Sequence, residues 1–206
     1  MDVTFRDIEH NLCIALDTNT VKILNPIFSE VANAVLCYGY IDKQAGLTYE
    51  VLAPVLYIDG EYSIIGEDNT VGVKVRAETY KDIEVIPIKN TALLEKFNER
   101  IDVIHKYYYS EDSVELTRSQ TSIDMFRHPF YPDDVEVLLF KQGYNPEKVW
   151  VRLTGYMGKS EGIDGFVGIL LNTPYDSRYG ISANDEVLVA VVSDSNGEVC
   201  FIVPKN

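Results

Sequence analysis

The last third of the chain alternates short apolar segments with turn residues, and this pattern restricts the fold more than any other feature. The segments have the length and the β-branched composition of strands, and they span residues 135–140, 149–156, 166–171, 186–192 and 199–203. The dipeptide Asn196-Gly197 lies between the last two and favours a tight hairpin turn. The pattern therefore predicts a β-rich C-terminal module.

The earlier part of the chain mixes helical and strand patterns. Apolar residues at three- and four-residue spacings predict helices over residues 3–16 and 27–38, and a further helix that begins after Asn90. Strand patterns span residues 20–24, 51–58, 61–65, 70–77 and 83–88. Asp59-Gly60 predicts a hairpin between two of these strands, because this dipeptide adopts the positive φ angles of a type I′ turn.

Between these two parts lies a polar segment of mixed charge, residues 110–122, which predicts a linker. We therefore expect two domains, an N-terminal α+β lobe over residues 1–110 and a C-terminal module over residues 123–206. The predicted fold class is α+β, with N-terminal helices and an antiparallel sheet followed by the β-rich module. Trp150 and Phe166 are expected to pack in the core of that module.

The chain has 206 residues and a net charge of −14, and its acidity is concentrated before the last module. Residues 1–149 hold 25 acidic and 14 basic residues, whereas residues 150–206 hold 7 and 4. Nucleic acids and anionic membranes bind Lys and Arg, so neither is an expected partner. An acidic surface favours a basic protein partner, and it also serves solubility alone.

The composition predicts a cytoplasmic protein. The first seven residues are acidic and polar, unlike a signal peptide, and no apolar run reaches the roughly 18–20 residues that cross a bilayer. The three cysteines, Cys13, Cys37 and Cys200, each lie in an apolar segment, which predicts buried and reduced thiols. No cofactor-binding motif and no metal-ligand spacing occurs in the sequence, so no cofactor or metal is expected.

One group of residues could support catalysis. His128 precedes Asp133 and Asp134, and a histidine beside carboxylates can act as an acid–base pair in a small hydrolase. The other interpretation is structural, because Pro132-Asp133-Asp134 also has the composition of a turn before a strand. A nucleophile elbow and a phosphate-binding loop are both absent from the sequence.

Aromatic residues cluster on both sides of the predicted linker. These candidate binding residues are Tyr107, Tyr108, Tyr109, Phe130 and Tyr131. An exposed aromatic cluster is typical of a protein-contact surface, and the same residues could instead pack two lobes together.

The segment that contains Trp150, Asn172-Thr173-Pro174 and Asn184-Asp185 carries a resemblance. Residues 147–206 resemble small uncharacterised bacterial domains, some of them described as immunity proteins of polymorphic toxin systems. Those domains have Gly-Asp where this chain has Asn184-Asp185, so the turn differs. The resemblance implies a non-enzymatic inhibitor that binds a basic bacterial toxin or effector. The alternatives are the hydrolase with His128 and a subunit of a larger cytosolic assembly.

Overall fold

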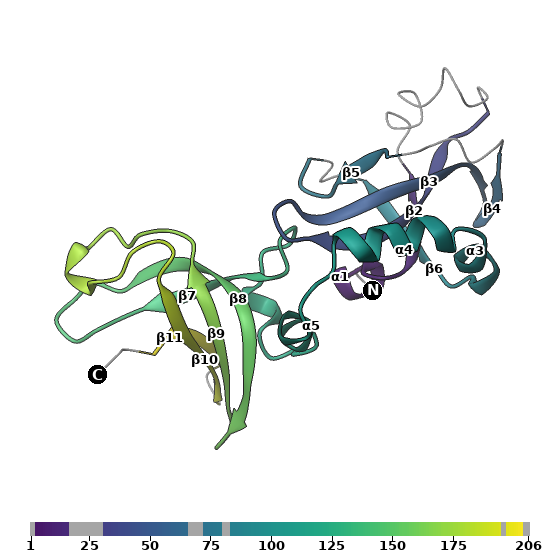
Figure 1. The fold of residues 1–206 in the computed structure, drawn as a ribbon. Helices are drawn as coiled ribbons and strands as arrows, with labels where there is room; N and C mark the ends of the chain where they lie inside the picture. The colour runs from purple at the N-terminus through teal and green to yellow at the C-terminus, as the bar shows by residue number, and fades with distance from the viewer. Residues whose placement is uncertain (1–2, 17–30, 66–71, 80–82, 195–196, 204–206) are drawn as a thin grey trace. The chain divides into compact units, whose positions relative to one another are not determined.

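The computed structural model describes residues 3–16, 31–65, 72–79, 83–194 and 197–203, and it divides the chain into two compact units. Unit 1 comprises Met1–Tyr109 and unit 2 comprises Ser110–Asn206. Both units are built mainly from strands, with short helices (Figure 1). Among the described residues, no helix is long and apolar enough to cross a membrane.

Unit 1 is a curved antiparallel sheet in the order β4-β3-β2-β1-β6, with β5 paired to β3. Its strands are β1 (Leu12–Leu16), β2 (Ala34–Asp42), β3 (Gly46–Ile58), β4 (Glu61–Ile64), β5 (Lys74–Arg76) and β6 (Glu84–Ile88). Its helices are α1 (Phe5–Ile8), α3 (Thr91–Lys96) and α4 (Asn98–Tyr107). Phe97, Ile101 and Ile104 bury their side chains against the sheet residues, which makes α4 the cover of one sheet face (Figure 1).

Two helix predictions in unit 1 were wrong. Only Phe5–Ile8 of the segment 3–16 is helical, and Leu12–Leu16 is a strand that pairs with both β2 and β6. Within the segment 27–38, the residues from Ala34 onward belong to β2. Both strands are buried along nearly their whole length, so their sequences lack the alternation that identifies a half-exposed strand. The predicted strand 20–24 lies outside the described residues.

The predicted strands 51–58, 61–65 and 83–88 and the start of a helix after Asn90 were confirmed, whereas in the described part of the segment 70–77 only Lys74–Arg76 is a strand. Asp59 and Gly60 form the β3–β4 turn with φ angles of 51° and 90°. The Asn90 side chain caps α3 by accepting a hydrogen bond from the Leu93 N–H at 3.1 Å. The helix predicted there is interrupted at Phe97, which lies between α3 and α4.

Gly60 provides a test of the turn between β3 and β4. We expect Gly60→Ala to destabilise unit 1 by about 1 kcal/mol, because a Cβ disfavours the positive φ angle of 90° at this position. Apart from its chain neighbours, no atom of the described residues lies within 4 Å of that Cβ, so the loss of stability reports backbone strain alone. Urea denaturation checks it, with Gly60→Asn as the matched variant. Because asparagine tolerates this conformation, Gly60→Asn should lower the free energy of unfolding about half as much as Gly60→Ala does. Equal losses of stability in the two variants would contradict the explanation.

Unit 2 is a closed barrel in the order β10-β11-β7-β8-β9. Its strands are β7 (Asp134–Leu139), β8 (Glu147–Ser160), β9 (Ile163–Leu170), β10 (Glu186–Asp194) and β11 (Gly197–Ile202). All five predicted strands are confirmed. Every pair is antiparallel except β11–β7, which closes the barrel in parallel through Phe201 and Leu138.

The barrel interior is filled by alternating side chains from all five strands. The buried core residues are Ile123, Val135, Val137, Leu139, Val149, Val151, Leu153, Phe166, Leu170, Val187, Val189, Val191, Cys200 and Ile202. The interior of a barrel with so few strands is filled by side chains of this kind. Trp150 was expected in this core with Phe166. Phe166 lies there, whereas Trp150 is half-buried on the other face of β8.

The predicted linker, residues 110–122, is wrong for most of its length. Helix α5 (Asp112–Arg118) forms within it and packs on β8, with Thr117 and Arg118 buried. The Arg118 guanidinium donates to both oxygens of Asp133, at 2.8 and 2.7 Å. The sequence of α5 is polar and did not predict a helix, because α5 attaches to the barrel through a buried ion pair and not through an apolar stripe.

The three cysteines are free and buried, as predicted. Burial raises the pKa of the Cys13 and Cys200 thiols to about 12. Both groups therefore stay protonated near neutral pH, and a protonated thiol is a poor nucleophile and metal ligand.

Candidate functional site

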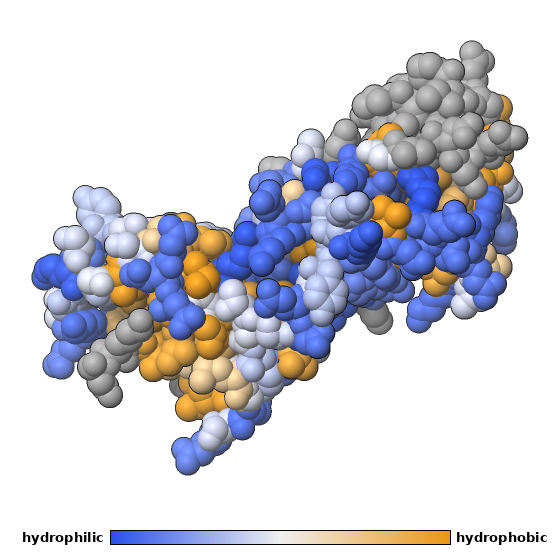
Figure 2. Space-filling view, in the orientation of Figure 1, coloured by the Kyte–Doolittle hydropathy of each residue, from blue (hydrophilic) through white to orange (hydrophobic). Residues whose placement is uncertain are grey.

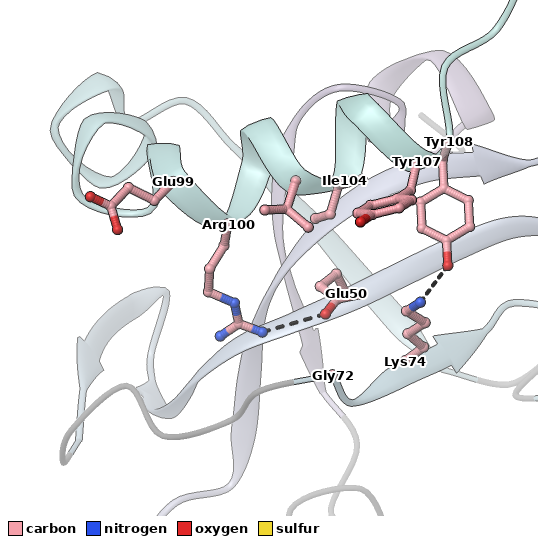
Figure 3. A pocket seen from close by; sticks show the side chains of 9 residues that line it. Glu50, Gly72, Lys74, Glu99, Arg100, Ile104, Tyr107 and Tyr108 are labelled. Carbon is pink, nitrogen blue, oxygen red and sulfur yellow. Dashed lines mark hydrogen bonds and ion pairs between the residues drawn. The ribbon is translucent and has the colours of Figure 1, made fainter.

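Unit 1 contains a pocket of about 620 Å³ between α4 and the strands β3 and β5 (Figure 3). Its walls combine charged, aromatic and aliphatic side chains. The lining residues are Glu50, Gly72, Lys74, Glu99, Arg100, Val103, Ile104, Tyr107 and Tyr108. We call this feature the α4 pocket.

The basic residues of the α4 pocket already have protein partners. Arg100 donates to the Val51 carbonyl at 2.8 Å and to the Leu52 carbonyl at 3.4 Å, and its Nη2 lies 3.4 Å from Oε1 of Glu50. The Lys74 ammonium donates to the Tyr108 hydroxyl and lies 4.7 Å from the centre of that ring (Figure 3). These contacts hold both cations against the pocket wall.

The structure distributes the predicted aromatic binding residues over both units. Tyr107 and Tyr108 line the α4 pocket, whereas Tyr109 is 70% exposed and is not among the lining residues. Phe130 and Tyr131 belong to unit 2, where both lie against the His128 ring.

Sequence reasoning missed the charged residues of the pocket. Glu50 is one such residue, and a carboxylate in the middle of the buried strand β3 was the available signal. Its partner Arg100 lies 50 positions later, on a helix face that the sequence presents as solvated. Only the fold brings these two residues together.

The candidate hydrolase residues meet in one turn but do not form an acid–base pair in the described contacts. Both oxygens of Asp133 accept from Arg118, and both oxygens of Asp134 accept from Arg152, at 2.6 and 2.8 Å. The His128 ring packs 5.3 Å from Trp150, and its Nδ1 accepts from the Phe130 N–H. A general base needs a hydrogen-bonded partner in reach, and these carboxylates orient arginines instead.

The outer surface of the barrel carries a group of apolar side chains on three neighbouring strands. We call this group the barrel patch, and it consists of Leu138, Phe140, Leu188, Val199, Phe201 and Val203. Four of these residues are between 37% and 47% exposed, and Leu138 and Phe201 are half-buried between them. Hydrophobic atoms gather over this part of unit 2 (Figure 2).

Pairing along the strands makes the barrel patch continuous. Phe201 is the register partner of Leu138, and its ring lies 5.8 Å from the ring of Phe140. On the other side, the Val203 N–H donates to the Leu188 carbonyl at 2.9 Å. The residues next to them in each strand have side chains that fill the core. Because successive side chains of a strand point to opposite faces, the patch residues point outward.

No protein-family model, curated protein or solved structure matches the chain. The resemblance of residues 147–206 to immunity domains therefore stays a prediction.

Proposed function

We propose that the protein is a non-enzymatic binding protein that contacts a protein partner through the barrel patch. The observation that carries this proposal is the continuous apolar surface on β7, β10 and β11. A contiguous exposed apolar surface commonly marks an interaction site. The patch also contains two phenylalanine rings, a residue type that is enriched in interfaces.

The form of the barrel favours this surface over others in unit 2. The five described strands close into a barrel, with β11 and β7 paired at Phe201 and Leu138, which restricts the sheet edge to which a partner could add a strand. The interior is filled, which leaves the outward side chains as the means of contact. Binding therefore depends on side-chain packing, and substitutions in the patch should change it directly.

The finer version of the proposal is a cytoplasmic immunity-type inhibitor that binds a basic toxin or effector. Its support is the resemblance of residues 147–206 and the net charge of −14, which would attract a basic partner and speed its association. A partner recognised in this way should bind more slowly as salt is added, because exposed charges are screened. Partner identity and the salt dependence of association test this version separately from the patch.

The patch is tested with the double variant Phe140→Ser/Leu188→Ser. Both side chains are exposed, so their loss should leave the barrel folded while it removes the apolar contact. Immobilised protein is incubated with extract of its source cells, and each retained protein is quantified for wild type and variant. We expect the variant to retain at least ~10-fold less of the specific partner than wild type does, which is the effect of removing residues at the centre of an interface.

The matched control is Tyr175→Ser, which removes a 97% exposed aromatic side chain outside the patch. It should retain the partner at the wild-type level. Trp150 is the single tryptophan and lies in unit 2, so its fluorescence verifies that each barrel is folded. The proposal is wrong if wild type and the double variant retain the same proteins in equal amounts, or if wild type retains none.

A further inference from the structure

The α4 pocket contains a buried acceptor without a hydrogen-bond partner among the described residues. Glu50 is 6% exposed, and its carboxylate faces the pocket below Ile104 (Figure 3). Oε1 of this carboxylate lies 3.4 Å from Arg100, but Oε2 is buried and has no hydrogen-bond partner among the described residues. A buried carboxylate oxygen without a partner is costly, so a native structure that retains one requires an explanation.

The two cations beside Glu50 are directed elsewhere, and the buried Tyr40 hydroxyl, which interacts electrostatically with Glu50, also lacks a hydrogen-bond partner among the described residues. Arg100 also donates to the main-chain carbonyls of Val51 and Leu52, and Lys74 donates to the hydroxyl of Tyr108. Burial outweighs these two cations and raises the pKa of Glu50 above its usual value. The protein thus leaves Glu50 incompletely compensated at the wall of the pocket. Oε2 is shielded from solvent, so a ligand supplies the missing donor when the Glu50 carboxylate turns toward the pocket.

We propose that the α4 pocket binds a small primary amine with an aromatic or aliphatic body, whose ammonium group donates to Oε2 of Glu50. The body of the ligand lies against the apolar side of the pocket, which is formed by Val103, Ile104 and the Tyr107 ring. The volume of about 620 Å³ is in the range of pockets that enclose small molecules. One charged contact beside an apolar wall is also the usual arrangement of such sites.

An amine fits this pocket better than an anion does. The unsatisfied atom is an acceptor, and the pocket adds a second carboxylate, Glu99, at its exposed side. An anion would have to approach Glu50 and displace Lys74 from Tyr108 or Arg100 from two carbonyls. The net charge of −14 further raises the local concentration of cations and lowers that of anions.

The test uses benzylamine as the probe and the full chain as the protein. Titration is followed by calorimetry and by NMR, with benzyl alcohol and benzoate as probes of similar shape that lack the ammonium group. We expect saturable binding of benzylamine and at least ~10-fold weaker binding of the other two, which is the range for removing one charged hydrogen bond. Benzamide separates a neutral N–H donor from a charged one, and it should bind more weakly than benzylamine.

Two variants test whether benzylamine binds in the α4 pocket. Glu50→Gln should weaken benzylamine binding at least ~10-fold, because an amide cannot offer the same charged acceptor. Val103→Trp enlarges a 53% exposed side chain at the pocket wall and should block binding while leaving Glu50 in place. Glu61→Gln, an exposed carboxylate on β4, is the matched control and should bind like wild type.

The outcomes are distinct from those for the barrel patch, which lies in unit 2. Phe140→Ser/Leu188→Ser should bind benzylamine as wild type does. The pocket proposal is overturned if benzylamine shows no saturable binding, if benzoate binds as tightly or more tightly, or if Glu50→Gln binds benzylamine unchanged in a folded protein. In the first case the pocket does not bind this amine.

Discussion

Replacing Asp133 with alanine is expected to destabilise the barrel of unit 2 by about 3 kcal/mol. The Asp133 carboxylate accepts two hydrogen bonds from Arg118, and both side chains are nearly inaccessible to solvent, at 11% and 5%. Without the carboxylate, the Arg118 charge stays buried with its contact to Glu115, whose side chain is 38% exposed. The pair also anchors α5 to the barrel, so the loss should be global for this unit.

The measurement is urea denaturation followed by Trp150 fluorescence, which reports on unit 2. Glu136→Ala is the matched control, because it removes one partner of the exposed Glu136–Lys148 pair on β7 and β8. Exposed ion pairs contribute about 0–1 kcal/mol to stability, so Glu136→Ala should lose far less stability than Asp133→Ala. The double variant Arg118→Met/Asp133→Leu tests the cause, because apolar residues of similar size can replace a buried pair with little loss.

Two results would contradict this account. If Asp133→Ala and Glu136→Ala lose the same stability, burial of the first pair has no special effect. If the double variant is as unstable as Asp133→Ala, the loss comes from the shape of the site and not from an unpaired charge. Either result would also remove the explanation of how the polar helix α5 holds to the barrel.

The sequence predicted unit 2 better than unit 1, and the reason is the burial of their strands. Strand β7 alternates buried and half-buried side chains beyond its first two residues, and in its sequence the polar residue Glu136 lies between the buried residues Val135 and Val137. Strand β2 is buried at every position, and nothing in its sequence separates it from a buried helix. The same continuous burial led to the wrong helix over Leu12–Leu16.

Long-range pairs account for what was missed at the candidate sites. The aromatic residues of the α4 pocket were predicted as binding residues because Tyr107-Tyr108-Tyr109 is visible as a local cluster. The charged pocket residue Glu50 was not predicted, because only the packing of α4 on β3 places it in the pocket. The barrel patch was missed for a related reason, since Phe140, Leu188 and Val199 lie on three strands that meet only when the barrel closes.

Gly168→Ala is expected to destabilise unit 2 by about 3 kcal/mol, at the upper end of the range for overpacking. Gly168 lies in β9 with its α-carbon facing the barrel interior, and an added Cβ would be 2.4 Å from Cγ1 of Val151 and 2.7 Å from the carbonyl oxygen of Arg152. The first contact involves a side chain, but the second involves the backbone of β8, which cannot move without disturbing the ladder. Gly165→Ala is the matched control in the same strand.

The Cβ added at Gly165 would meet its nearest atoms at 3.5 and 3.7 Å, which is ordinary contact. This control should be neutral or slightly stabilising, because alanine restricts the unfolded chain more than glycine does. Adding Val151→Ala to Gly168→Ala relieves the side-chain contact and leaves the Arg152 carbonyl, so the double variant should lose less than the sum of the single losses. Strictly additive losses would show that the contact at Val151 does not set the spacing of β8 and β9, and the close fit of the barrel would need another cause.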